Sequence, residues 1–144
     1  MGTERVEKDA SIPICMNEAI KKIDLPYVSI TYIEPIVYFE YKEGTELGFP
    51  EILKLISCAE ELSNHKPYVT FADARVSINI TNEGKRILSD IENMPLFRGT
   101  AVLVNNNLYK YAATLLGIYS RPEYPFRAFT SKEDAIKWLS SLSL

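Results

Sequence analysis

Polar side chains that could do chemistry follow three apolar segments of the chain. Asp73 ends the run PYVTFAD, asparagines 105–107 follow GTAVLV, and Thr130 and Ser131 follow PFRAF. In open parallel sheets ligands bind outside the carboxyl ends of the strands, so we expect these side chains at one shared edge. Asp73 is the best carboxylate candidate there. We favour the alternative that Asp73 is a turn residue accepting backbone hydrogen bonds, because no histidine lies near it in the sequence.

A second polar group surrounds the start of a predicted helix. The residues from Ser77 to Thr81 connect the preceding strand to NEGKRILSDIENM, and Thr81 is the expected N-cap of this helix. Gly84 lies on its apolar face and would permit close packing. Lys85 and Arg86 fall in its first turn, where the helix dipole disfavours cations. An anion or phosphate site at this N-terminus would account for them. The interpretation we favour is two solvated side chains whose stems cover apolar surface.

Aromatic and basic residues crowd the stretch from 109 to 127. They are Tyr109, Tyr119, Tyr124, Phe126, Arg121 and Arg127. Tyrosine and arginine are enriched at protein interfaces, because both supply contact area and a polar group. Tyr109 and Tyr124 are therefore candidates for binding a partner or a second copy in a homodimer. A partly buried helix flank explains the same cluster equally well.

Composition and charge exclude several classes of protein. The chain has 144 residues, and 16 Lys+Arg against 19 Asp+Glu give a net charge of −3, which argues against nucleic-acid binding. Two cysteines, Cys15 and Cys58, and one histidine, His65, support neither a disulfide framework nor a zinc site. The dinucleotide, P-loop, GxSxG and HExxH motifs are missing. We therefore expect no cofactor, no metal site, no membrane span and no enzymatic activity, in a reduced and cytoplasmic protein.

Strand-like and helix-like segments alternate after an antiparallel β-hairpin at Tyr27–Lys42, in which Glu34 and Pro35 separate the two strands. This alternation predicts an α/β domain with a mostly parallel sheet covered by about four helices. We divide the chain into an N-terminal extension, residues 1–26, partly disordered, and one domain, residues 27–144. The predicted helices lie within residues 49–66, 82–94, 108–120 and 131–142, and the predicted strands within 67–74, 99–105 and 125–130.

From about residue 27 to residue 142 the chain resembles the STAS/SpoIIAA-like superfamily. The resemblance is closest to the small stand-alone bacterial proteins labelled STAS/SEC14-domain. Its most telling pieces are the segment from Asp73 to Leu88, which has a strand, a loop and a Thr-capped helix, and the closing FRAFTSKEDAIKWL. The resemblance implies a SpoIIAA-like order of β-α repeats.

The resemblance also implies a function. In anti-sigma-factor antagonists of this superfamily, a partner kinase phosphorylates a serine in a D-S-S-G turn at this helix N-terminus. Thr81 falls near that serine and is the phosphorylation candidate, while Ile80 replaces the acidic residue and Glu83 stands where the glycine would be. The implied protein is a non-enzymatic cytoplasmic module for protein interaction or regulation. The alternative, from the SEC14-like side of the resemblance, is a domain that binds a small apolar ligand or a lipid.

Overall fold

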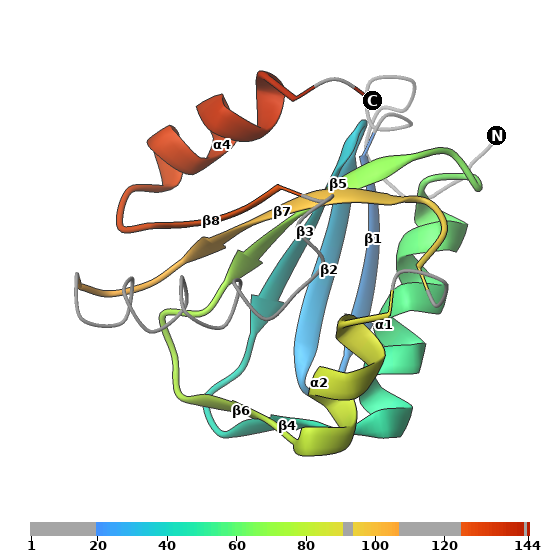
Figure 1. Ribbon diagram of the computed structural model, residues 1–144, viewed down its shortest axis with the longest axis vertical. Helices are drawn as coiled ribbons and strands as arrows, with labels where there is room; N and C mark the ends of the chain where they lie inside the picture. Colours follow the sequence, from blue (N-terminus) through green and yellow to red (C-terminus); the bar gives the residue numbers. More distant parts are fainter. Residues whose placement is uncertain (1–19, 91–93, 107–124, 143) are drawn as a thin grey trace, which may run out of the picture.

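A six-stranded sheet in the order β1-β2-β3-β5-β7-β8 forms the centre of the fold (Figure 1). The computed structural model describes residues 20–90, 94–106, 125–142 and 144. Strands β1 to β3 pair antiparallel, whereas β3, β5, β7 and β8 run parallel. A separate sheet pairs β4 and β6 in parallel. The strands are β1 (Ile20–Leu25), β2 (Val28–Ile33), β3 (Ile36–Tyr41), β4 (Thr45–Leu47), β5 (Tyr68–Asp73), β6 (Ile78–Ile80), β7 (Phe97–Leu103) and β8 (Phe126–Phe129).

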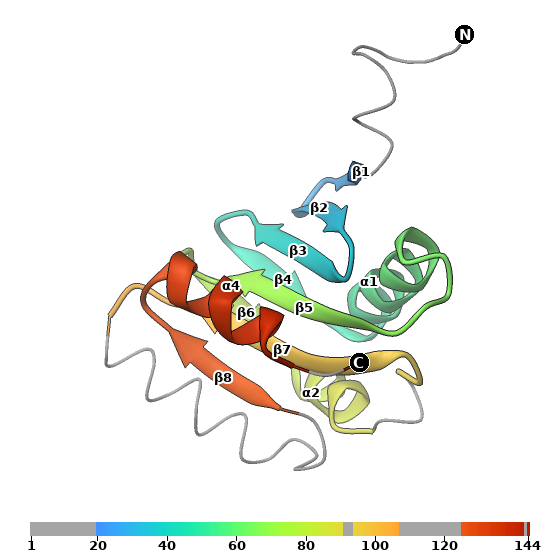
Figure 2. The same ribbon diagram turned by 90° about the horizontal axis from the view of Figure 1, so that it is seen from above.

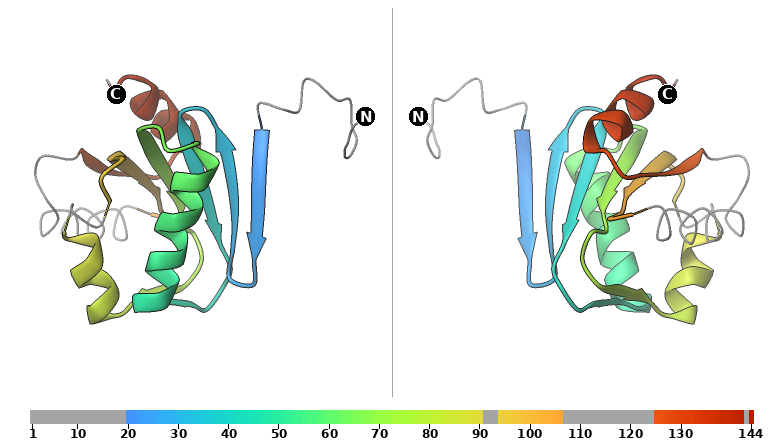
Figure 3. Two further views of the ribbon diagram at one scale, coloured as in Figure 1. Left: turned by 90° about the vertical axis from the view of Figure 1, so that its right-hand side faces the viewer. Right: turned by 90° about the vertical axis from the view of Figure 1, so that its left-hand side faces the viewer.

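Helices cover both faces of the large sheet, as Figure 3 shows. Helix α1 (Phe49–Leu62) packs on one face beside α2 (Asn82–Leu88), and α4 (Lys132–Ser140) packs on the other against β5, β7 and β8. Two apolar clusters result, one on each face. The cluster under α1 includes Ile30, Phe39 and Ile52, and the cluster under α4 includes Phe71, Leu103 and Leu139.

The predicted α/β class and the entry hairpin are confirmed. Strands β2 and β3 are that hairpin, in a register that pairs Ile30 with Phe39. Within the described residues there are three helices. The fourth predicted helix, residues 108–120, lies outside them.

Two elements differ from the sequence-based expectation. Residues 20–25, which we assigned to the N-terminal extension, form β1 and pair along their whole length with β2. Ile23 and Leu25 pack against the α1 cluster, but Lys21, Lys22 and Asp24 interrupt the strand, so its apolar signal in the sequence is weak. Residues 78–80, expected as a connection, form β6.

Side-chain hydrogen bonds lie at the starts of α1 and α4. The amide of Gly48 donates to Oε1 of Glu51 at 3.0 Å ahead of α1, and Oγ of Ser131 accepts from the Asp134 amide at 3.3 Å ahead of α4. Both bonds satisfy amides that have no partner inside their helix. They fix where each helix starts relative to the strand before it.

Buried side chains of α1 include a thiol. Cys58 is buried and free, as expected for a core residue, and burial raises the pKa of its thiol. Cys15 lies outside the described residues. His65 follows the end of α1, is exposed and has a positive φ of 60°.

Candidate functional site

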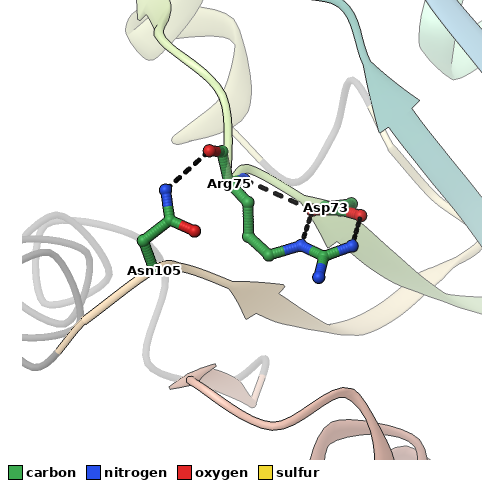
Figure 4. Close-up of polar contacts among 3 residues, drawn as sticks. All are labelled: Asp73, Arg75 and Asn105. Carbon is green, nitrogen blue, oxygen red and sulfur yellow. Dashed lines mark hydrogen bonds and ion pairs between the residues drawn. The ribbon is translucent and has the colours of Figure 1, made fainter.

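Asp73 ends β5 at the carboxyl edge of the parallel strands, where Arg75 binds it (Figure 4). The Arg75 guanidinium donates from Nε to Oδ1 at 2.9 Å and from Nη2 to Oδ2 at 2.7 Å. The backbone amide of Arg75 also donates to Oδ1 at 3.3 Å, as expected for a turn residue. Both carboxylate oxygens are therefore engaged by one arginine two residues along the chain.

The electrostatics of this pair stabilise the ionised carboxylate. Hydrogen bonds from the Arg75 side chain lower the pKa of Asp73, and the nearby charge of Lys132 acts in the same direction, while partial burial opposes it. Reciprocally, Asp73 raises the pKa of Arg75. A carboxylate held ionised by a bidentate cation is a poor general base, because its lone pairs are occupied and its basicity is reduced.

Other residues predicted at this edge have separate roles. Nδ2 of Asn105, after β7, donates to the carbonyl oxygen of Arg75 at 2.7 Å and so ties two strand-end loops together (Figure 4). Ser131 caps α4 instead, and Thr130 is exposed. Sequence reasoning missed Arg75, although its position two residues after Asp73 was a usable signal.

A second candidate site lies where α1 and α2 begin side by side at the end of the small sheet (Figure 1). The Thr81 amide donates to the carbonyl oxygen of Leu47 at 3.0 Å. A Cβ built on Gly84 would lie 2.5 Å from that oxygen, and one on Gly48 would lie 3.6 Å from Oγ1 of Thr81. The glycine at position 84 therefore lets α2 approach the end of β4 closely, whereas a Cβ at position 48 would make ordinary van der Waals contact with Thr81. The expected close packing of α2 at Gly84 is confirmed.

Thr81 caps α2, as expected. Its Oγ1 accepts from the Gly84 amide at 3.0 Å and donates to the carbonyl oxygen of Leu47 at 3.4 Å. The side chain is half-buried. A phosphate ester oxygen has no proton to donate, so phosphorylation would remove the bond to Leu47. Phosphorylation of Thr81 stays a prediction.

Lys85 and Arg86 do not lie where the sequence placed them. Helix α2 ends at Leu88, so both exposed cations belong to its last turn, where the dipole favours them. Ser89 is the C-cap of this helix, and its hydroxyl donates to the carbonyl oxygen of Arg86 at 2.8 Å. The expected conflict between these cations and the helix dipole was wrong, and with it the reason for an anion site.

Ser77 lies in the connection between β5 and β6. Its side chain is exposed, and its amide donates to Oε1 of Glu43 at 3.3 Å. Its carbonyl oxygen accepts from the Gly44 amide at 2.7 Å. The backbone of Ser77 therefore holds the strand connection in place, and its hydroxyl faces solvent.

The first two turns of α1 expose apolar side chains that sequence reasoning did not select. Phe49 is 53% exposed and Leu53 is 41% exposed. They lie four residues apart, so they neighbour each other along the helix, at the border of the stripe of buried side chains that includes Ile52 and Leu55. The sequence could have indicated these two residues, because apolar residues at the start of this helix fall outside the stripe of side chains expected to be buried.

Tyr109 and Tyr124, with the helix predicted between them, lie outside the described residues. Among the side chains that the structure describes, no group of three or more His, Cys, Asp or Glu could hold a metal ion. The described helices are all too short or too polar to cross a membrane.

Comparisons with known proteins agree with this architecture. The sequence pattern of one protein family, DUF7793, described as a domain of unknown function, matches residues 30–143. A crystal structure of an uncharacterized DUF3478-family protein from Shewanella loihica PV-4, with a SpoIIAA-like fold, is similar with a TM-score of 0.54 and 16% sequence identity. The match covers 84% of this chain and 92% of that one. No curated protein matches the sequence. The predicted SpoIIAA-like fold is thereby confirmed.

Proposed function

Since the chain belongs to the DUF7793 family, a domain family of unknown function, we propose from its geometry that it is a non-catalytic protein-interaction module. The surface that we assign to this role is the α1 surface, defined by Phe49 and Leu53 beside the N-cap Thr81. The observation that carries the proposal is the exposure of Phe49 and Leu53 on one side of α1. Removing such side chains from water on binding is favourable in proportion to the apolar area buried.

The base of the α1 surface is rigid. The Thr81 amide and hydroxyl, at the start of α2, both donate to the carbonyl oxygen of Leu47, two residues before α1, and β4 and β6 pair directly ahead of the two helices. A rigid apolar anchor costs little conformational entropy on binding, which favours recognition of a partner. The partner chemistry that fits is a protein segment with apolar side chains spaced to contact both Phe49 and Leu53.

The strand-end cluster supports the non-catalytic part of the proposal. Asp73, the best carboxylate candidate of the sequence, is bound on both oxygens by Arg75. Acid–base catalysis needs a group whose pKa lies near the working pH, and Arg75 moves the pKa of Asp73 away from it. This cluster is better suited to holding two loops together.

The test uses a photo-crosslinking phenylalanine analogue in the full chain, produced in its native cells. Placed at position 49, it should give a discrete adduct with one protein, whereas the same analogue at Lys137 on α4 should not. Adding Leu53→Ser should remove the adduct while leaving the circular dichroism spectrum unchanged. Equal labelling at positions 49 and 137, or an adduct that is insensitive to Leu53→Ser, would contradict the proposal.

A further inference from the structure

Strand β1 is one edge of the six-stranded sheet, at the opposite side from β8 (Figure 2), and no described strand lies beyond it. The direction of its backbone groups follows from a contact in the neighbouring hairpin. The Lys42 amide donates to the carbonyl oxygen of Tyr27 at 3.0 Å, so the backbone N–H and C=O groups of Tyr27 point toward β3. The backbone N–H and C=O groups of successive residues point to alternate sides of a strand, so those of the next residue, Val28, point toward β1. Its partner there, Leu25, therefore directs its own amide groups toward β2.

The same alternation along β1 sets the outer edge. The backbone N–H and C=O groups of Ile23, like those of Leu25, point toward β2. Those of Lys22 and Asp24 point outward, away from the sheet. The side chains of Lys22 and Asp24 are exposed and lie on one face of the sheet, where the Ser29 hydroxyl donates to Oδ1 of Asp24 at 2.7 Å. The edge therefore offers a lysine and an aspartate two residues apart, each with its backbone groups directed to where another strand would pair.

These two charges select one register for a strand added antiparallel about a twofold axis. With the axis at Ile23, Lys22 lies opposite Asp24 of the second copy, and Asp24 lies opposite its Lys22. With the axis at Lys22 or at Asp24, like charges would lie opposite each other, which destabilises a strand pair. An axis between two residues would place a residue whose backbone groups point outward opposite one whose backbone groups point toward β2. The two strands could then not form the regular hydrogen bonds of an antiparallel pair. Of the registers centred on Lys22, Ile23 or Asp24, the one through Ile23 satisfies both the charges and the backbone.

The usual protection of an edge strand is weak here. Lysines on an edge normally discourage pairing. Lys21, however, points back to the domain, where its Nζ lies 3.4 Å from the carbonyl oxygen of Leu62 at the end of α1. The remaining lysine, Lys22, gains an opposite charge in the register through Ile23. In the same register the partly buried Ile23 meets its own copy, which covers apolar surface at the margin of the α1 cluster.

We propose that β1 pairs antiparallel with β1 of a second copy of this chain, about a twofold axis through Ile23. The two six-stranded sheets then form one continuous sheet across an isologous interface. The proposed pairing rests on the backbone and charges of the β1 edge, whereas the proposed partner binding rests on Phe49 and Leu53, so the two are argued from different observations.

Charge reversal tests the register. Sedimentation velocity of the full chain should show a dimer at micromolar concentration. Lys22→Asp or Asp24→Lys alone should each weaken it by about tenfold or more, because each makes two like-charge pairs. An equimolar mixture of the two single variants should restore a dimer, since the two aspartates of one copy then face the two lysines of the other. Glu133→Lys on α4 is the matched control and should leave the dimer unchanged.

A cross-linking measurement keeps the proposal testable if a charge variant fails to fold. With Cys15 replaced by Ser, Ile23→Cys should form a disulfide-linked dimer under mild oxidation, because this position meets itself. Leu25→Cys, opposite Lys21 of the copy, should not. A monomeric wild type, a dimer indifferent to both reversals, a mixture that does not restore the dimer, or equal cross-linking at positions 23 and 25 would each overturn the proposal.

Discussion

At the scale of single residues, Arg75 decides what Asp73 does. The carboxylate is at the position where parallel sheets expose functional groups, yet three bonds from one neighbour occupy it. Arg75 is half-exposed, so solvent and salt screen the pair and its contribution to stability is small. The value of the contact is structural, because the same Arg75 carbonyl holds Asn105 of the next loop.

Replacing Arg75 by Gln should raise the pKa of Asp73. The bonds that lower it are lost, while the partial burial that raises it remains. Because the folded pKa lies below that of the unfolded chain, about 4, the pair stabilises the fold above that pH. The stabilisation disappears as the pH falls through the folded pKa. Carboxyl carbon NMR titration measures the shift, with Arg98→Gln at the other end of β7 as the control. An unchanged pKa in Arg75→Gln would refute the assignment of the cause.

At the scale of elements, features with local causes were predictable from sequence. The cap at Thr81 and the cap at Ser131 each depend on a hydroxyl and an amide three residues away, so both appear in the sequence. The edge strand β1 and the three-residue strand β6 depend on partners elsewhere in the chain. Strand β6 pairs with β4 across a separation of 33 residues, and three residues are too few to show a period.

The candidate site shows the same division. Asp73 could be placed at a strand end from its sequence position, but the bidentate contact from Arg75 depends on a side-chain rotamer. Likewise Phe49 and Leu53 fit an amphipathic helix equally well as core or as surface residues until the sheet determines which face is buried. The fold class was therefore predictable, and the surface that carries the proposed function was not.

Gly84→Ala should destabilise the protein, although alanine is the better helix former. The added methyl would lie 2.5 Å from the carbonyl oxygen of Leu47 and 3.1 Å from Cγ2 of Ile80. Overpacking of this kind costs about 1–3 kcal/mol, which exceeds the gain of about 1 kcal/mol in helix propensity. Urea unfolding measures the change. Glu83→Ala, exposed on the same turn, is the control and should change stability by about 0.5 kcal/mol or less. Stabilisation by Gly84→Ala would mean that α2 does not pack on β4.

At the scale of the whole molecule, the burial of tyrosine side chains makes the stability of the fold depend on pH. All five tyrosines of the described residues have a raised pKa, and burial is the first cause for each: Tyr27, Tyr32, Tyr38, Tyr41 and Tyr68. The increase is largest for Tyr41 on β3 and Tyr68 on β5. Tyr68 is 2% exposed and stacks edge-on against Phe97, with ring centroids 6.4 Å apart. Ionising these phenols in the folded state would place charge inside or beside the apolar clusters.

The protein should therefore unfold cooperatively in alkali. In the unfolded chain a tyrosine ionises near pH 10, whereas in the fold the raised pKa keeps the phenol neutral, so stability is complete below about pH 10 and decreases as the pH rises above it. Part of the increase in tyrosinate absorbance should then coincide with the loss of helical circular dichroism. Tyr68→Phe removes one of the two strongest contributions and should move the unfolding midpoint to higher pH. Tyr27→Phe, with a smaller rise in pKa, should move it less. If every tyrosine ionised near pH 10 while the circular dichroism stayed constant, the burial of Tyr68 and the partial burial of Tyr41 would be refuted, and with them the packing of β3 and β5 at the centre of the sheet.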